Sequence, residues 1–458
     1  MGNEALFRDK PVWRAIFSLA IPAVLTILIM VIYHMADMFF IGMLGDDTQV
    51  AAISVVSPVF SLATAVGTML GAGGCAVIAK ALGAGQDGQA RAVGSLCVWC
   101  SLLFGVVFAA AVIPAASPVL RVLGATEDMK DYAAVYLRIL ALGAPVMLFS
   151  TTMGSVVRAE GAVIPGMLCN IAGTAANLIL DPLFILVLRL GVAGAALATV
   201  LGNLIASVCL GAVVKMKTRV LTLSPKPALR RSKLLLHTMA VGLPNGLSSV
   251  LSGMTSTFSN QLLSLYGSGA IAAMAAAGRA TMIISMVQMG ICLGVAPLMA
   301  YNYGAGNQPR LKEILVKTSV LTTVFGIAST ALCFVFRDAL IGLFLKDSAN
   351  VEISRTFLTW LLLASPLLGF YYLSSNYFQA VGSALTATVI SVLRQGALLI
   401  PCLYIFHAFL GLPGIGIAHL ASDVVAVVIA VVLFVLHFRK QHDYRKMEGE
   451  QHEKERML

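Results

Sequence analysis

Three carboxylates lie well inside long apolar segments of this sequence, and they are Asp37, Asp181 and Asp423. A charged group placed in hydrocarbon costs about 2.5–3.5 kcal/mol or more, so each acid needs a partner or a watery cavity. Carboxylate oxygens bind small cations, and two carboxylates close together in a low dielectric raise each other's affinity for protons. The three acids therefore predict proton or cation chemistry inside an apolar protein.

Neutral oxygen ligands occur at the same depth as two of these acids. Asn177 precedes Asp181 by four residues, so both project from one helix face about one turn apart. At a rise of about 1.5 Å per residue, Asp37, Tyr136 and Thr199 fall at a depth similar to that of Asp181. We predict a proton or Na⁺ site, with Asp37, Asn177, Asp181 and Thr199 as the candidate Na⁺ ligands. In the alternative, each acid only caps or hydrogen-bonds a neighbouring helix.

A second group of residues has the character of an adaptable substrate cavity. Met and aromatic side chains accommodate varied ligands, because they are polarizable or present flat apolar faces. The residues assigned to this candidate cavity are His34, Met282, Met286, Gln288, Met289, Tyr371, Tyr372 and Arg394. The alternative for each of them is ordinary packing or contact with lipid.

Several embedded ionisable residues have open roles. His34 precedes Asp37 by three residues, so it could tune or shuttle a proton, or it could be a histidine held near the interface. His419 precedes Asp423 by four residues and could pair with it, although we favour a structural role. Arg394 has no acidic neighbour in the sequence, so we expect backbone carbonyls or helix ends to satisfy it.

The elements that must position these residues are membrane helices. Charged residues make up 11% of the chain, against about 25% in soluble domains. This excludes a secreted, disordered or ordinary cytosolic protein. The apolar runs exceed the roughly 9–11 residues of a barrel strand. We predict an all-α integral membrane protein with twelve transmembrane helices, near residues 15–42, 51–78, 93–116, 132–157, 163–188, 192–214, 237–265, 272–300, 314–336, 356–379, 386–409 and 414–438.

The sequence carries no signature of a cofactor. All eight Cys lie inside predicted spans, where they behave as small hydrophobic residues. The pair Cys97-x-x-Cys100 could bind a metal or cycle between redox states, but no second pair accompanies it. The sequence has no G-x-x-x-x-G-K-[ST] motif and no soluble domain for ATP, so we expect an ion gradient to supply the energy.

The basic residues predict the orientation of the chain. Most of the 31 Lys and Arg residues fall in alternate loops on the side of both termini. The positive-inside rule assigns that side to the cytoplasm. The net charge of +10 is therefore a topology signal, and we expect no nucleic-acid partner for the basic stretch 215–233.

The second half of the chain repeats the first at an offset near 221. The segment Gly83-Ala84-Gly85-Gln86 recurs as Gly304-Ala305-Gly306-Asn307. Six spans in each half give two repeats with the same orientation in the membrane, which is the parallel-repeat plan of many transporters. The predicted domains are an N-lobe (1–214), a cytoplasmic linker (215–236), a C-lobe (237–438) and a cytoplasmic tail (439–458).

The repeat also predicts which half carries the ion chemistry. The second half has no acid at the positions that correspond to the candidate cation site. The counterparts of Asp37, Asn177, Asp181 and Thr199 are Ser259, Leu398, Cys402 and His419. A structural need shared by both halves would have kept the acids, so we expect ion binding in the first half.

Four further features accompany the duplicated twelve spans: Pro22 and Asp37 in the first span, Arg158-Ala159-Glu160-Gly161 after the fourth, and Asn177-x-x-x-Asp181 in the fifth. Together these features resemble the multidrug and toxic compound extrusion (MATE) family, most closely its bacterial DinF-like and MepA-like branch. The resemblance covers nearly the whole chain. It implies antiport of cationic or amphipathic compounds against H⁺ or Na⁺, by rocking of two lobes in a bacterial inner membrane with both termini cytoplasmic.

The resemblance also implies roles for particular residues. It implies a helix bend at Pro22 and a cation network in the N-lobe that consists of Asp37, Tyr136, Asn177, Asp181 and Thr199. The family's other branch uses acidic residues in the seventh and tenth spans, and residues 237–265 and 356–379 contain no Asp or Glu. We expect a monomer whose partners are the lipid bilayer and small organic cations or amphiphiles.

Two other functions compete with export. A flippase for lipid-linked saccharides of the same superfamily favours an arginine-rich cavity, and here only Arg138, Arg279 and Arg394 are embedded. A channel should place its filter symmetrically in both halves. An intramembrane enzyme should show a cluster of His with Asp or Glu at one depth, for which His34 with Asp37 is the candidate.

Overall fold

The computed structural model describes the backbone over residues 4–43, 47–123, 125–342 and 348–457. Every regular element in these ranges is a helix. In chain order they are α1 (Glu4–Arg8), α2 (Val12–Gly42), α3 (Asp47–Gly83), α4 (Asp87–Val112), α5 (Ala116–Val122), α6 (Glu127–Val156), η1 (Val157–Glu160), α7 (Val163–Pro182), η2 (Leu183–Val187), α8 (Gly191–Lys217), α9 (Lys226–Arg230), α10 (Leu234–Ser264), α11 (Ser268–Gly304), α12 (Gln308–Val335), α13 (Arg337–Gly342), α14 (Ser348–Val381), α15 (Ala384–Val392), η3 (Leu393–Ala397), α16 (Leu399–Leu410) and α17 (Leu412–Met457).

Twelve helical segments of the described chain are long and apolar enough to cross a membrane, which confirms the predicted all-α membrane fold. The predicted spans 237–265 and 272–300 are separated by a turn at Gly267, and the predicted spans 356–379 and 386–409 by a turn at Gly382. The φ angles of these glycines, 91° and 86°, lie in the left-handed region, which glycine adopts without steric cost. Each glycine thus allows one span to end and the next to begin.

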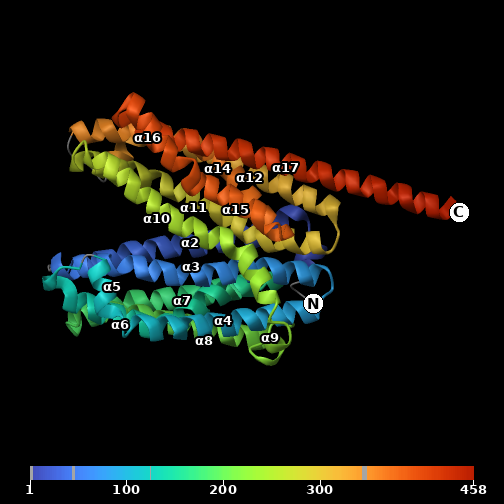
Figure 1. The fold of residues 1–458 in the computed structure, drawn as a ribbon, viewed down its shortest axis with the longest axis horizontal. Helices are drawn as coiled ribbons and strands as arrows, with labels where there is room; N and C mark the ends of the chain where they lie inside the picture. The colour runs from blue at the N-terminus through green and yellow to red at the C-terminus, as the bar shows by residue number, and fades with distance from the viewer. Residues whose placement is uncertain (1–3, 44–46, 124, 343–347, 458) are drawn as a thin grey trace.

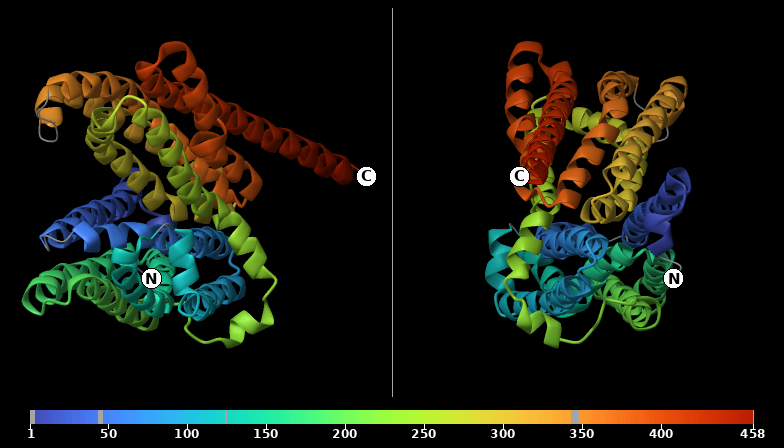
Figure 2. Two further views of the ribbon diagram at one scale, coloured as in Figure 1. Left: turned by 60° about the vertical axis from the view of Figure 1, so that its left-hand side comes forward. Right: turned by 90° about the vertical axis from the view of Figure 1, so that its right-hand side faces the viewer.

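The twelve spans form two bundles of six (Figure 1). In the first bundle, α3 and α4 pack on α6, and α7 packs on α8. In the second bundle, α14 packs on α11, α12 and α17. The linker around α9 connects the bundles, and the two chain termini lie toward the same end, as Figures 1 and 2 show. We call this end the terminal end and the opposite one the distal end.

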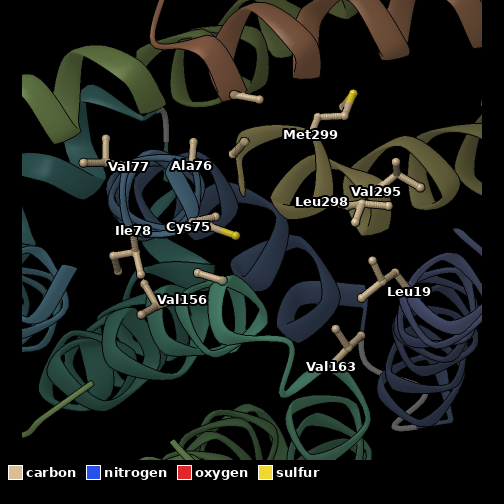
Figure 3. Close-up of a cluster of buried hydrophobic side chains, with 14 of the residues drawn as sticks. Leu19, Cys75, Ala76, Val77, Ile78, Val156, Val163, Val295, Leu298 and Met299 are labelled. Atoms are coloured by element: carbon tan, nitrogen blue, oxygen red, sulfur yellow. The ribbon is translucent and has the colours of Figure 1, made fainter. Parts of the chain in front are cut away.

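The buried apolar residues show where the bundles join. The largest cluster lies in the terminal half, and it contains Leu19 of α2, Ile78 of α3, Val163 of α7 and Leu298 of α11 (Figure 3). The clusters nearer the distal end each belong to one bundle only. The two bundles therefore share a hydrophobic core at the terminal end and have separate cores at the distal end.

Glycines bring the backbones of the two bundles into direct contact at the terminal end. A Cβ on Gly83 of α3 would overlap the carbonyl oxygen of Tyr301 in α11, and a Cβ on Gly304 would overlap that of Lys80. The two contacts are reciprocal, because Gly83 and Gly304 are counterparts in the repeat, as are Lys80 and Tyr301. The glycines that marked the repeat in the sequence thus form the closest approach between its copies.

A lysine adds a polar contact across the same interface. Lys80 Nζ donates to the carbonyl oxygen of Val381, at the C-terminus of α14, over 2.8 Å. The same ammonium lies 5.0 Å from the centre of the Tyr303 ring. A cation is favoured at a helix C-terminus and over an aromatic face. A cavity of about 240 Å³ remains beside this contact, and Ala76 of α3 is among the residues that line it.

The bundles diverge toward the distal end. Near the terminal end α3 meets α10 where Gly73 approaches Thr238 and Gly242. Nearer the distal end, Ser57 and Ser61 of α3 and Ser249, Gly253 and Thr257 of α10 are exposed.

Candidate functional site

Two of the predicted cation-site residues are buried together on α7. Asp181 is completely buried, and Asn177, one turn earlier, is 3% exposed. Gly173 of α7 and Gly202 of α8 let these helices approach until backbone meets backbone, and Gly202 lies against the Cβ of Asn177. Asn177 and Asp181, which are four residues apart, thus form one polar face of α7, and α8 covers it.

The amide of Asn177 has no hydrogen-bond partner among the described residues. Both its Nδ2 and its Oδ1 are buried and unsatisfied there. Leaving a buried polar group unsatisfied costs about 1–3 kcal/mol, so an amide retained for packing alone is unfavourable. This amide oxygen stays a predicted ligand of the cation.

The backbone after Asp181 is irregular. Pro182 ends α7, and the next five residues form the π-helical segment η2 (Leu183–Val187). Proline removes a backbone donor, and single-turn π segments in helices occur frequently at functional sites. The change of helix type widens the turn that directly follows the carboxylate.

Tyr136 and Thr199 approach the same region from other helices. The half-buried Tyr136 of α6 packs against the cluster formed by Ile185 of η2 and Ala195 of α8. Thr199 lies one turn further along α8 and is also half-buried. The structure therefore places Tyr136 beside η2 and α8, and a cation network of Tyr136 and Thr199 with Asp181 stays a prediction.

The distal half of α2 completes this side of the bundle. Phe40 packs on the cluster around Ile185, which places the end of α2 beside η2. Asp37 and His34 belong to this part of α2, but their side chains lie outside the described residues. Among the described side chains, no group of three or more His, Cys, Asp or Glu could hold a metal ion. Participation of Asp37 thus stays a prediction.

Pro22 lies inside α2, which packs on both bundles. On the two sides of Pro22, Leu19 meets Gly294 of α11 and Val24 meets Gly290. The helix also packs on α7 of the first bundle, and Phe40 reaches the cluster around Ile185. The hydroxyl of Thr26 donates to the carbonyl oxygen of Pro22 over 2.8 Å. Because proline cannot donate the helical hydrogen bond, this position is suited to bending.

The described residues that were assigned to a substrate cavity have three different environments. On α11, Met286 and Met282 continue, toward the distal end, the face that meets α2 at Gly290 and Gly294; Met282 is 39% exposed there. Met289 is half-buried. A substrate cavity lined by these methionines stays a prediction.

Gln288 has a different environment. It is fully buried, and its Nε2 donates to the backbone carbonyls of Thr322 (3.2 Å) and Ser365 (3.0 Å). These bonds join α11 to α12 and α14. The contacts describe a packing role inside the second bundle, which was the alternative considered for this residue.

The structure corrects the expected partner of Arg394. We expected backbone carbonyls or helix ends to satisfy it, but its Nε donates to Asp423 Oδ1 over 2.7 Å. Tyr371 and Tyr372, also assigned to the substrate cavity, lie against the same guanidinium. The two charges are 29 residues apart on different helices, so only tertiary packing brings them together.

Comparison with known proteins assigns the family. The MatE family model matches this chain twice, over residues 22–183 and over residues 244–405, with one match in each bundle. The chain belongs to the MatE family. MatE proteins are transporters and not enzymes, and the double match agrees with the duplication seen in the sequence.

The relatives of this MatE chain cover almost its whole length. Multidrug export protein MepA of Staphylococcus aureus (strain NCTC 8325 / PS 47) is 30% identical over 439 residues, covering 95% of this chain and 97% of the relative. The protein of the same name from Staphylococcus saprophyticus is 31% identical over 441 residues, with the same coverage. A crystal structure of MATE in complex with MaL6 has a TM-score of 0.90 at 25% identity, covering 97% of this chain and 100% of that one.

Sequence reasoning missed the partner of Arg394 in this MatE chain. Asp423 stands on a different span, 29 residues away, so no local spacing identifies the pair.

Proposed function

We propose that this chain exports cationic or amphipathic organic compounds by antiport against H⁺ or Na⁺. The observation that carries the proposal is the buried Asn177 amide with no partner among the described residues, one turn from the buried carboxylate of Asp181. The names of the MepA relatives, which are multidrug export proteins, support the substrate class. The coupling ion binds Asp37, Tyr136, Asn177, Asp181 and Thr199.

We place the protein in a bacterial inner membrane, as a monomer with both termini in the cytoplasm. The distribution of basic residues supports this orientation. The terminal end, where the bundles touch, is then the cytoplasmic side, and the bundles diverge toward the outside. Substrate leaves from this state, and the distal ends must come together before the lobes can open inward.

Coupling follows from differential affinity. An ion shifts the equilibrium between two lobe arrangements only by as much as its affinity for them differs. The candidate ion site lies toward the distal end, so H⁺ or Na⁺ from outside reaches it in the outward-open state. Binding of the ion there favours release of the drug and return of the emptied carrier.

The flippase alternative has less support. An arginine-rich cavity would need free guanidinium groups, and Arg394 is engaged by Asp423. The experiment that tests export is efflux of a cationic dye from everted vesicles under an imposed ΔpH or ΔNa⁺. If neither gradient drives movement of the dye, the proposal is wrong.

Asn177→Leu should weaken ion coupling without weakening the fold. The amide has no described protein partner to lose, so its replacement should leave the melting temperature equal to or above that of the wild type. Loss of one ligand should raise the ion concentration for half-maximal dye efflux about tenfold, which corresponds to about 1.4 kcal/mol.

Gln288→Leu is the matched control for this prediction, because it removes a buried amide that donates to two backbone carbonyls. It should lower the melting temperature and leave the half-maximal ion concentration unchanged. If Asn177→Leu behaves like Gln288→Leu in both measurements, Asn177 is structural.

A further inference from the structure

A largely but not fully buried ion pair lies inside the second bundle, away from the proposed ion site. Arg394 Nε and Asp423 Oδ1 are 2.7 Å apart, and their side chains are 15% and 14% exposed. Arg394 belongs to η3 in the eleventh span, and Asp423 belongs to α17 in the twelfth. Removing one partner of such a pair leaves an uncompensated buried charge, which is strongly destabilising.

Two aromatic rings complete the surroundings of the guanidinium. Arg394 Cζ lies 4.8 Å from the centre of the Tyr371 ring and 5.7 Å from that of Tyr372, both on α14. A cation within about 6 Å of an aromatic centroid is attracted by the ring, more strongly when water is excluded. A carboxylate and two aromatic rings therefore surround one positive charge.

The backbone is shaped to present this side chain. Arg394 belongs to the π-helical segment η3 (Leu393–Ala397), whose widened turn frees backbone carbonyls. The carbonyl of Gln395 accepts from Thr255 Oγ1 of α10, and that of Arg394 accepts from Ser422 Oγ of α17 over 3.4 Å. Hydroxyls of the two neighbouring spans thus hold the irregular turn.

The first bundle has no room for such a side chain at the corresponding place. At the offset of 221 residues, the counterpart of Arg394 is Gly173, where an added Cβ would lie 2.6 Å from the carbonyl oxygen of Gly202. In the next span the local offset is 220, and the counterpart of Asp423 is Asn203, which donates to the carbonyl of Thr199. The fifth and sixth spans therefore touch directly, whereas the eleventh and twelfth spans enclose the Arg394 guanidinium.

We propose that the second bundle contains a preformed cation site whose permanent occupant is the Arg394 guanidinium. Asp423 supplies the charge, and Tyr371 and Tyr372 supply the aromatic faces. His419 lies one turn before Asp423, and its buried Nε2 has no partner among the described residues, so it adds a polar group to this site. Because the site is filled by the chain itself, Asp423 is not available to a transported ion.

Chemical rescue tests the site directly. Arg394→Ala should empty it and lower the melting temperature of the purified protein. Millimolar methylguanidinium should then raise that temperature by several degrees in a saturable manner, because a ligand that binds only the folded state stabilises it. Wild type, which is already filled, and Arg394→Ala/Asp423→Asn, which lacks the charge, should show no such rise. Absence of a saturable rise, or an equal rise in the double variant, would overturn the proposal.

A second comparison applies if Arg394→Ala cannot be purified. Arg394→Lys keeps a cation and Arg394→Met keeps a similar length without charge. The Lys variant should retain the higher melting temperature, and equal melting temperatures would show that no charge is bound there. Neither measurement uses transport, so failure of the proposed export function would leave these results interpretable.

Only the statement about coupling rests on the proposed function. The neutral pair Arg394→Met/Asp423→Leu should keep the ion dependence of dye efflux unchanged. A lost ion dependence in this double variant, with normal dye binding, would show that Asp423 takes part in coupling and would contradict the permanent occupancy.

Discussion

Asp181→Asn should abolish ion-driven export and leave a folded, membrane-inserted protein. The amide keeps the shape of the carboxylate but cannot exchange a proton or hold a negative charge. Asp181 is completely buried at the end of α7, next to the Asn177 amide, so water cannot replace the lost charge. Dye efflux from everted vesicles should fall to background under an imposed ΔpH and under an imposed ΔNa⁺. Asp37→Asn should have the same effect.

The control removes the other described embedded carboxylate, Asp423, together with its partner, as Arg394→Gln/Asp423→Asn. This pair should keep efflux and its ion dependence, with at most a loss of stability. Efflux at the wild-type rate in Asp181→Asn would show that Asp181 does not bind the coupling ion. If instead the Arg394→Gln/Asp423→Asn variant lost ion-driven efflux and Asp181→Asn kept it, the ion site would be at Asp423.

Gly304→Val should trap the two bundles apart at the terminal end. Its side chain would overlap the backbone of Lys80, and Gly83→Val would overlap that of Tyr301. Backbone cannot move aside as a flexible side chain can, so the state with a shared terminal core loses several kcal/mol relative to the state without it. Export should fall by about tenfold or more, because alternating access needs both states populated.

Labelling with a membrane-impermeant maleimide measures this shift. In a background without the eight native Cys, Ala76→Cys is 8% exposed at the interface and should react slowly in everted vesicles. Adding Gly304→Val should make it react quickly. Gly211→Val in α8 meets no other atom within 4 Å and should leave labelling and export unchanged. Slow labelling with Gly304→Val would show that the glycine contact does not hold the terminal end closed.

The sequence predicts well what composition and local spacing determine. Long uncharged runs must become helices in a membrane, because only helices and closed barrels satisfy their own backbone there. The turn at Gly382 and the shared face of Asn177 and Asp181 follow from local rules of the same kind. These features depend on residues within one or two helical turns of each other.

Features that depend on how helices meet were less predictable. The Arg394–Asp423 pair and the Gln288 amide bonds join different helices, and nothing local identifies the partners. The glycines at 83 and 304 were visible as a repeat, but their contact across the bundles requires the pseudo-twofold arrangement of the two copies. The π segments were equally hidden, because apolar spacing does not reveal one added residue in a turn.

The central claim is that an ion at Asp181 and a cationic substrate compete through the first bundle. Equilibrium binding of a cationic dye to purified protein, titrated with H⁺ and separately with Na⁺, measures this competition directly. The account predicts that at least one of the two ions weakens dye binding in the wild type and that the effect disappears in Asp181→Asn. Dye affinity independent of both ions in the wild type, or an ion effect that survives in Asp181→Asn, would contradict it.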